Sequence, residues 1–427
     1  MKRTVTLLLL FTALLSGYTK PVEAQFWKKK KKEQRRKPAP KKPVVKEKPV
    51  AKPVKKKREL VYPATEKKAR YRVDIFAPLY LGELVKDDKV TFKGKLPAKA
   101  LQGLEFYEGI KLAADTLSSF GFDVDVYVHD VTDSTGSPQE LINRGGLDST
   151  HLIIGSVPTQ YVRPLASFAK KHTVNFISAL SPSDADITDN PYFTLLQPTL
   201  QSHCEFIVTN IKNKYPGKKP LLLYRTTVPA EQNAFNYVLN ANNDVKQLPV
   251  NALPTAAQLK PLFDSNGVNI VVVTILDNAY AESLLKLLAG SFPTYKFDVY
   301  GMPSWTTISS LKKPGVFTNM AVFITTPFNF DATTMAGQSL ANIYKKEYGG
   351  MKPGEMVFRG YETMYWYTYL LNKYGTIFNE NLGDNGIAPF TRFNIKPKWD
   401  KDDNFLYNEN QNVYLYRYLD GSYVIQQ

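Results

Sequence analysis

The sequence predicts an α/β protein with doubly wound parallel sheets, and three features of the chain indicate this fold. Strand-like and helix-like segments alternate along most of its length. The segment NIVVVTIL at 269–276 is almost entirely apolar, as expected for a parallel strand buried between two helix layers. The part of the chain after residue 70 also exceeds the roughly 250–300 residues that one hydrophobic core usually serves. We therefore expect two lobes, each with its own sheet.

The stretch 152–181 has the pattern of a strand, a turn, a helix and a second strand. Pro164 is best tolerated in the first turn of a helix, so this helix is expected to start near Gln160. The loop 155–159 then lies between the carboxyl end of a strand and the amino terminus of a helix, where parallel sheets bind ligands. The hydroxyl-rich loop 178–184 follows the next strand. Alternatively, both are ordinary loops whose hydroxyls cap helices.

The other elements are expected in the same alternation of strand and helix. Strands are predicted at 71–78, 122–128, 220–225, 297–300 and 321–325. Helices are predicted at 103–117, 202–213, 230–240, 256–263, 278–288, 332–348 and 360–374, and an extended crossing at 190–198. The last segment alternates polar and apolar residues, and Asp420-Gly421 is typical of a hairpin turn.

Residues 1–24 have the pattern of a secretory signal peptide. Lys2 and Arg3 precede an apolar core at 5–15, and the small residue Ala24 precedes the expected cleavage site. The apolar core is too short to span a bilayer. A lipoprotein signal would need a cysteine near the place where Tyr18 stands. We therefore expect export across the inner membrane to the periplasm, without a lipid anchor.

The formal net charge of +16 comes from one segment of the chain. Residues 25–70 hold 20 Lys and Arg against 4 Glu, and the part from Tyr71 onward is close to neutral. This distribution argues against a nucleic-acid-binding body. The segment is also rich in proline, so it is expected to be disordered and extended. It is either a solvated spacer or a polybasic arm that attaches to an anionic membrane face or to a cell-envelope polymer.

No catalytic or metal-binding motif stands out. The sequence has no phosphate-binding loop, Cys-x-x-Cys, His-Glu-x-x-His or Gly-x-Ser-x-Gly. Its four histidines, His129, His151, His172 and His203, are isolated from one another. Cys204 is the only cysteine, so an intrachain disulfide is excluded and burial as a small apolar residue is expected. We therefore expect no enzymatic activity, no metal and no cofactor.

The order of these features resembles the type I periplasmic binding proteins, which include leucine/isoleucine/valine-binding proteins and ligand-binding regions of receptors. The resemblance lies in YRVDIFAPLY, GLEFYEGIKLAADTL, HLIIGS with PLASFAKKHTVNFISALS, and FRGYETMYWYTYLLNKYG, and covers roughly 73–375. It implies two α/β lobes joined by three crossing strands, with a ligand enclosed between them by hinge closure. Domains that activate peptidoglycan synthases look similar.

The signal-peptide pattern and the composition set the first two domain boundaries, and the resemblance implies those of the two lobes. We expect a signal peptide at 1–24 and a disordered basic arm at 25–70. The first lobe is expected at 71–197 and 325–385, and the second at 198–324 and 386–427.

The same resemblance places ligand-binding residues in loops that face each other across the cleft. The candidates are Tyr80, Ser156, Thr159, Ser178 and Ser181 in the first lobe, and Tyr224, Arg225, Asp277 and Trp305 in the second. Hydroxyls and helix-terminal N–H groups would hold a carboxylate, and Asp277 would hold an amine. Asp277 is alternatively a helix cap, Arg225 only a strand-end charge, and Trp305 either stacks on a sugar or ring or packs in the core.

The leading hypothesis is a periplasmic solute-binding protein that closes on a small polar ligand and passes it to a membrane transporter of the ABC type or to a sensor. An amino acid, a short peptide or a cell-wall fragment would be the ligand. The alternative is a cell-envelope interaction protein of peptidoglycan synthesis, with a degenerate cleft and a synthase as partner.

Overall fold

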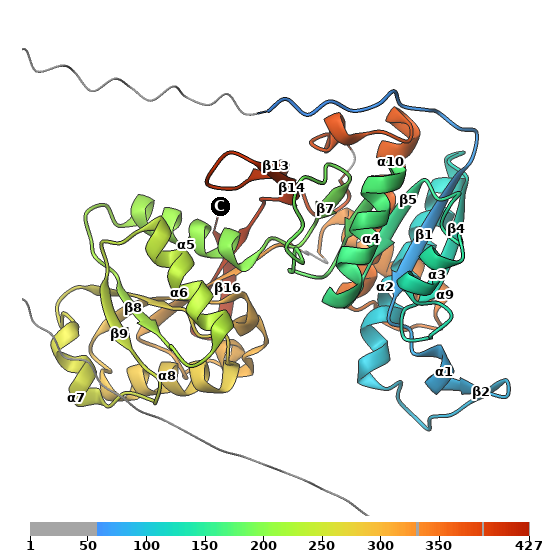
Figure 1. Cartoon of the computed structure of the whole chain (residues 1–427). Coiled ribbons are helices and arrows are strands. Elements are labelled where there is room, and N and C mark those ends of the chain that lie inside the picture. The colour runs from blue at the N-terminus through green and yellow to red at the C-terminus, as the bar shows by residue number, and fades with distance from the viewer. Residues whose placement is uncertain (1–57, 330–332, 387, 427) are drawn as a thin grey trace, which may run out of the picture. The chain divides into compact units, whose positions relative to one another are not determined.

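Two seven-stranded sheets organise the described part of the chain (Figure 1). The computed structural model describes residues 58–329, 333–386 and 388–426. The predicted signal peptide and residues 25–57 of the predicted arm lie outside these residues.

The first sheet forms the first lobe and has the strand order β13-β14-β7-β6-β5-β1-β4. Its strands are β1 (Tyr71–Ala77), β4 (Val124–Asp130), β5 (Leu152–Gly155), β6 (Asn175–Ser178), β7 (Phe193–Leu195), β13 (Ile395–Trp399) and β14 (Phe405–Asn410). All neighbouring strands are parallel except β13, which pairs antiparallel with β14. A small hairpin of β2 (Val85–Lys86) and β3 (Lys89–Val90) lies in the segment after β1.

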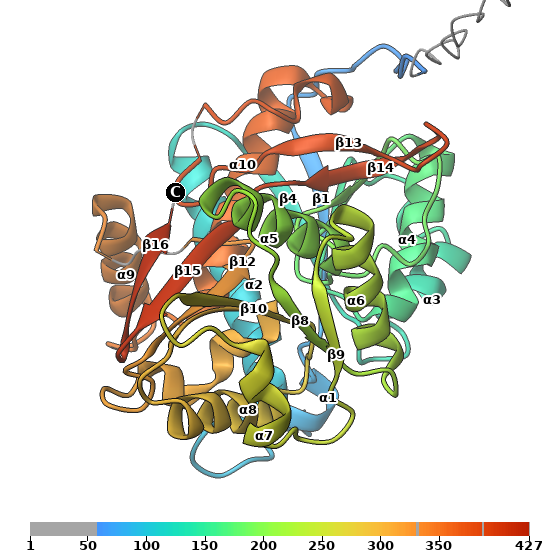
Figure 2. The same ribbon diagram turned by 90° about the vertical axis from the view of Figure 1, so that its left-hand side faces the viewer.

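The second sheet forms the second lobe and has the order β16-β15-β12-β11-β10-β8-β9. Its strands are β8 (Leu221–Tyr224), β9 (Lys246–Pro249), β10 (Val268–Val273), β11 (Lys296–Gly301), β12 (Met320–Thr326), β15 (Tyr414–Leu419) and β16 (Ser422–Gln426). The strands from β12 to β9 are parallel, and β15 and β16 extend the sheet antiparallel, as Figure 2 shows. Asp420 and Gly421 join β15 to β16 with positive φ, which confirms the predicted hairpin turn.

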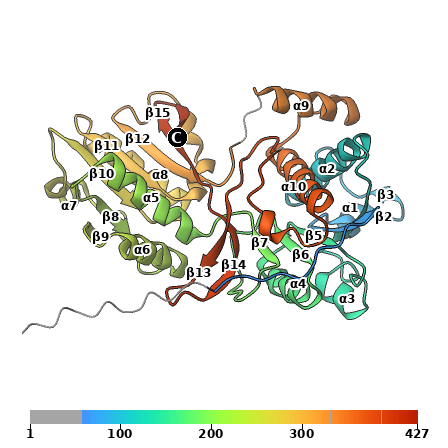
Figure 3. The same ribbon diagram turned by 90° about the horizontal axis from the view of Figure 1, so that it is seen from above.

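Helices cover both faces of the first sheet (Figure 3). The helices of this lobe are α1 (Leu81–Leu84), α2 (Ala98–Ser119), α3 (Pro138–Asn143), α4 (Thr159–His172), α9 (Met335–Glu347), α10 (Glu355–Tyr374) and the short η4 (Asn379–Asn381). One core lies between the sheet and α2, α9 and α10, and another between the sheet and α3 and α4. Alternation along the strands explains this: Ile75 enters the first core and the next residue, Phe76, enters the second.

The helices of the second lobe surround one large core. They are α5 (Leu200–Lys214), α6 (Pro229–Ala241), α7 (Ala256–Leu259), α8 (Asn278–Ser291) and the short η1 (Lys260–Leu262), η2 (Pro303–Thr307) and η3 (Ser309–Lys312). The predicted doubly wound α/β fold with two lobes is therefore confirmed. The chain passes from one lobe to the other between β7 and α5, between β12 and α9, and between β14 and β15, which gives the three expected crossings.

The predicted boundaries of the second lobe need one correction. We assigned 386–427 to that lobe, but β13 and β14 belong to the first sheet, because β14 pairs parallel with β7 through Asn408 and Thr194. Only β15 and β16 of this segment lie in the second sheet. The strand β14 was not predicted, because the polar residues Asn408, Glu409 and Asn410 are typical of an exposed loop. In the structure all three are buried.

The arm boundary at residue 70 needs a second correction. Residues 58–70 form no helix or strand but contact the first lobe. The hydroxyl of Thr65 donates a hydrogen bond to the Tyr374 carbonyl at 2.7 Å, and the ring of Tyr62 packs edge-on against Tyr192 at 6.3 Å. A half-buried aromatic ring and an exposed hydroxyl therefore hold residues 58–70 against the first lobe.

Candidate functional site

The predicted first-lobe residues cluster where two parallel strands end. Ser156 follows β5 and Ser178 ends β6, and the register pairs Gly155 with Ser178, so the two loops are neighbours. The backbone N–H of Ser156 donates to the Phe76 carbonyl at 2.8 Å. Ser178 is fully buried, and its hydroxyl has no hydrogen-bond partner among the described residues.

The other predicted hydroxyls of this lobe are less enclosed. Thr159 is the exposed first residue of α4, which starts one residue before the expected Gln160. The hydroxyl of Ser181 accepts a hydrogen bond from the Ser183 N–H at 3.2 Å. Tyr80 precedes α1 with a left-handed backbone (φ 56°), and the ammonium of Lys99 lies 4.8 Å from its ring centre.

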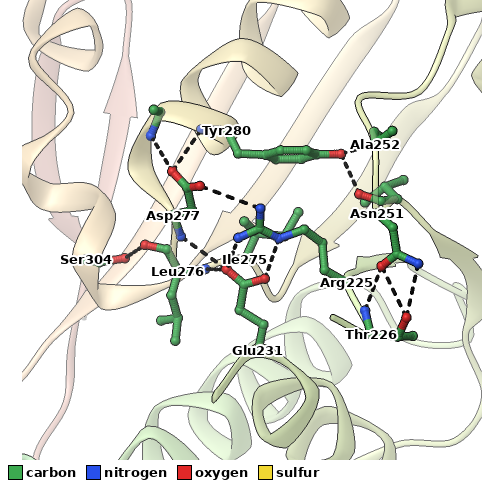
Figure 4. A network of polar contacts seen from close by, with 12 residues as sticks. Arg225, Thr226, Glu231, Asn251, Ala252, Ile275, Leu276, Asp277, Tyr280 and Ser304 are labelled. Atoms are coloured by element: carbon green, nitrogen blue, oxygen red, sulfur yellow. Dashed lines mark hydrogen bonds and ion pairs between the residues drawn. The ribbon is translucent and has the colours of Figure 1, made fainter. Parts of the chain in front are cut away.

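In the second lobe, Arg225 and Asp277 come together in one network of polar contacts (Figure 4). Glu231 accepts hydrogen bonds from Nε and Nη2 of Arg225 at 2.5 and 2.6 Å, and also from the Leu276 N–H at 2.9 Å. Nη1 of Arg225 lies 3.5 Å from Oδ2 of Asp277. The hydrogen bond with buried Glu231 raises the pKa of Arg225. This network ties the loop after β8 to the loop after β10.

Asp277 and Trp305 have structural roles in this arrangement. Oδ1 of Asp277 accepts hydrogen bonds from the Ala279 and Tyr280 N–H groups, so Asp277 caps α8. Trp305 is fully buried and its ring nitrogen donates to the Ile275 carbonyl at 2.8 Å. The face of its ring is therefore not open to a sugar or ring, and the packing alternative applies. Tyr224 stacks on Phe235, with ring centres 3.8 Å apart.

A cavity of about 550 Å³ lies apart from these side chains and is lined by residues of both lobes. Its lining residues are Gln102, Leu180, Gln197, Pro303, Thr306, Thr307, Lys312, Thr325, Thr326, Pro327, Phe328, Glu355, Met356, Arg359, Tyr416, Tyr418 and Tyr423. None of the predicted site residues is among them. Leu180 and Thr306 are, however, sequence neighbours of Ser181 and Trp305, so sequence analysis selected adjacent segments but not these side chains.

Arg359 is the most deeply enclosed charge of this cavity. It lies in the first turns of α10, its side chain is 11% exposed, and burial lowers its pKa. Its Nε donates to Glu355 at 3.0 Å and its Nη2 also contacts Glu355. Its guanidinium lies 3.4 Å from the ring centre of Phe328. Nη1 has no hydrogen-bond partner within the described part of the chain.

Hydroxyl groups and aromatic rings of the second lobe complete the cavity. Thr325 on β12 is fully buried, and its hydroxyl has no partner in the described ranges. Tyr416, Tyr418 and Tyr423 form a cluster on β15 and β16, with ring centres 5.0 Å apart for Tyr416 and Tyr423 and 5.3 Å apart for Tyr418 and Tyr423. Burial raises the pKa of Tyr418 to about 12.

The alternation of Tyr416 and Tyr418 in the sequence could have indicated part of the cavity lining. Tyr416 and Tyr418 alternate along a predicted strand, so they share one face of it. Arg359 directly precedes the predicted helix 360–374, whose aromatic residues we interpreted as core, and no local pattern marks Nη1 of Arg359 as a binding group.

The described residues contain no group of three or more His, Cys, Asp or Glu side chains suited to a metal ion. In the same residues, no helix is long and apolar enough to cross a membrane.

No family model and no curated protein matches this sequence. Solved structures share its fold at low identity. A putative branched-chain amino acid ABC transporter from Rhodospirillum rubrum is 12% identical with a TM-score of 0.61, over 84% of this chain and 99% of that chain. An ABC transporter substrate-binding protein from Desulfitobacterium hafniense in complex with leucine is 15% identical with a TM-score of 0.54, over 84% and 100%.

Full-length LpoA from Haemophilus influenzae is also similar, at 14% identity with a TM-score of 0.54. The match covers 85% of this chain and 60% of LpoA. The chain has two seven-stranded sheets joined by three crossings, and the solved structures similar to it share its fold. It therefore has the two-lobed fold of the type I periplasmic binding proteins.

Proposed function

We propose that this protein binds a small polar ligand in the cavity lined by both lobes and catalyses no reaction on it. The observation that carries the proposal is a pair of buried polar groups in the cavity wall, Nη1 of Arg359 and the hydroxyl of Thr325, which lack partners in the described residues. Leaving such groups unpaired costs about 1–3 kcal/mol each, and a bound polar molecule would supply the missing partners.

The similar solved structures also support a ligand-binding role. A structure with this fold binds leucine, and others are named as ABC transporter components. We therefore infer an amino acid, a short peptide or a cell-wall fragment as ligand, and delivery to a transporter or a sensor. The signal-peptide pattern at 1–24 supports a periplasmic location. Ser156 and Ser178 stay candidate contacts, because they end adjacent strands and the Ser178 hydroxyl has no partner among the described residues.

A second candidate function is an interaction role in peptidoglycan synthesis, with a synthase as partner and a degenerate cleft. The observation that favours it is the network around Arg225. Arg225, Glu231 and Asp277 satisfy one another, and Trp305 is buried, so these strand-end loops offer few free groups to a ligand.

A thermal-shift panel of amino acids, short peptides and cell-wall fragments tests the proposal. A ligand that binds only the native state raises the melting temperature, by the equivalent of about 2.7 kcal/mol at a hundred times its Kd. If no compound shifts the melting temperature and the protein instead captures a peptidoglycan synthase in a pull-down, the second function is supported.

Thr325→Val provides the matched test of the cavity. Valine keeps the shape of threonine, and removal of an unpaired buried hydroxyl should raise the free energy of unfolding by up to about 1–3 kcal/mol, because the cost of the missing partner is removed with it. The ligand-induced shift should fall. Thr274→Val is the control, because Thr274 is also buried with an unpaired hydroxyl among the described residues but does not line the cavity. An equal effect of both variants on the shift would place the ligand elsewhere.

A further inference from the structure

The guanidinium of Arg359 has one edge engaged and one nitrogen free. Glu355 takes hydrogen bonds from Nε and contacts Nη2. Both N–H groups of Nη1 remain without an acceptor in the described residues, although the side chain is almost completely buried. The N–H groups of this nitrogen suit an oxyanion, because a guanidinium donates charge-assisted hydrogen bonds to carboxylate oxygens.

The charges that line the cavity favour an anion over a cation. Among the described lining residues, Arg359 and Lys312 supply two positive charges and Glu355 supplies one carboxylate. Glu362 approaches Arg359 from the same helix, but burial raises the pKa of Glu362 to about 7, so this second acid is only partly ionised near neutral pH. An ammonium group would meet more positive than negative charge here, and a carboxylate the reverse.

The cavity also has aromatic lining residues. Tyr416, Tyr418 and Tyr423 line it from β15 and β16, and Tyr423 is 50% exposed whereas Tyr418 is 4% exposed. Aromatic faces pack against flat or ring-shaped groups, and tyrosine hydroxyls donate and accept hydrogen bonds. The guanidinium of Arg359 lies over the ring of Phe328, and Tyr416 stacks on Tyr423, so Tyr423 has the most exposed ring among the described lining residues.

We propose that the ligand of this cavity carries a carboxylate beside a ring, with Nη1 of Arg359 bound to the carboxylate and the tyrosine cluster packed against the ring. This inference rests on the proposed function and narrows its ligand to a class: a sugar acid or an aromatic acid. The alternative is that Arg359 only packs α10 against Phe328. In that case replacing Arg359 would not change the preference of the protein for acids over neutral molecules.

Matched pairs of probes test the carboxylate directly. N-acetylmuramic acid differs from N-acetylglucosamine by the 3-O-lactyl group that carries its carboxylate, and benzoate differs from benzamide by the charge of one group. Calorimetric titration of the full chain should show that at least one acid binds roughly ten- to a hundredfold more tightly than its neutral partner. The two pairs separate a sugar acid from an aromatic acid.

Two variants connect the result to Arg359. Arg359→Gln should abolish the preference for the acid, and Arg144→Gln, which changes an exposed arginine away from the cavity, should keep it. Glu355→Gln leaves Arg359 in place and removes the charge that competes with the ligand, so it should strengthen acid binding several-fold. Stronger acid binding by Glu355→Gln therefore tests the role of Arg359 even if Arg359→Gln fails to fold.

The outcomes separate this inference from the proposed function. If the panel of amino acids, peptides and cell-wall fragments gives a ligand but neither acid binds better than its neutral partner, the carboxylate assignment is wrong and the proposed function stands. The same holds if Glu355→Gln and Arg359→Gln leave the preference unchanged. If nothing binds in either set, the proposed function fails and this inference fails with it.

Discussion

Glu362 is a buried carboxyl group that makes the stability of this protein depend on pH. It lies on α10, is 2% exposed, and accepts hydrogen bonds from the N–H and the hydroxyl of Thr391 at 3.0 and 3.2 Å. Burial is the largest influence on it and raises its pKa from 4.5 to about 7, although the Thr391 hydrogen bonds and Arg359 act in the opposite direction. The neutral carboxyl is therefore favoured in the folded state.

This raised pKa predicts a loss of stability as pH rises. Below about pH 4.5 the carboxyl is protonated in both states, and between 4.5 and 7 the unfolded chain loses its proton first. The contribution of Glu362 to stability is therefore present at low pH and lost as pH rises through 7. Glu362→Gln, which imitates the neutral carboxyl, should gain on the order of 3 kcal/mol relative to the parent between pH 4 and pH 8.

Urea unfolding of the parent and the variant across this pH range measures the difference. Glu380→Gln is the control, because Glu380 is an exposed residue of the same lobe and should change the pH profile little. Parallel pH profiles for the parent and Glu362→Gln would contradict the prediction.

At the scale of single residues, sequence reasoning predicted roles that depend on neighbours along the chain. The cap alternative for Asp277 needed only the helix that follows it, and the structure shows that cap. The partner of Arg225 lies six residues away on the next helix, and Arg359 meets a cavity formed by distant segments. Neither environment leaves a pattern in the local sequence.

At the scale of elements, α2 and α10 pack so closely that glycines form their contact. A Cβ atom on Gly109 would lie 2.0 Å from the Val357 carbonyl oxygen, and one on Gly360 would lie 2.0 Å from the Phe106 carbonyl oxygen. Each helix therefore lacks a side chain where the backbone of the other approaches. This contact fixes the position of α10, whose first turns carry Glu355 and Arg359.

Gly360→Ala should destabilise the protein by about 1–3 kcal/mol or more, because the added methyl group forces the two backbones apart. Gly290→Ala on α8 is the matched control, since no atom lies within 4 Å of its Cβ position. Alanine has the higher helix propensity, so this variant should be up to about 1 kcal/mol more stable than the parent. Chemical denaturation measures both, and a stabilising Gly360→Ala would show that the helices are not in this close contact.

Elements with strong periodicity were predictable, and polar strands were not. The helices that became α5, α6 and α8 and the strand β10 were expected close to their observed bounds, whereas α10 begins at Glu355, five residues before the predicted start at Gly360. The strand β14 was missed because Asn408, Glu409 and Asn410 are buried through contacts with other segments rather than through apolar character.

At the scale of the whole molecule, Glu409 links the two lobes at a crossing. It lies on β14 of the first sheet, is 1% exposed, and pairs with Lys398 of β13 at 2.7 Å. It also accepts hydrogen bonds from the Thr199 N–H at 2.7 Å and the Ser202 hydroxyl at 3.0 Å, at the start of α5 in the second lobe. A carboxylate is favourable at the amino terminus of a helix.

Glu409→Ala should lower the free energy of unfolding by about 3–5 kcal/mol, because Lys398 loses its partner in a largely buried site. Cys204 provides a specific readout, since it is fully buried in the second lobe and burial raises the pKa of its thiol to about 12. Thiol labelling therefore requires opening of that lobe, and the variant should be labelled faster. Asn213→Ala, an exposed change on the same helix α5, should leave both measurements close to the parent. If Cys204 in Glu409→Ala is labelled at the parent rate, the hydrogen bonds from Glu409 to the start of α5 do not stabilise that helix.

The sequence by itself determined the α/β class, the alternation of elements and the concentration of positive charge before residue 70, because periodicity and composition are local properties. Only the tertiary structure decided that β14 completes the first sheet and that Arg225 is paired with Glu231. It also decided that Arg359, whose Nη1 has no partner among the described residues, lines a cavity formed by both lobes. These features depend on contacts between segments far apart in the chain, and such contacts leave no local pattern.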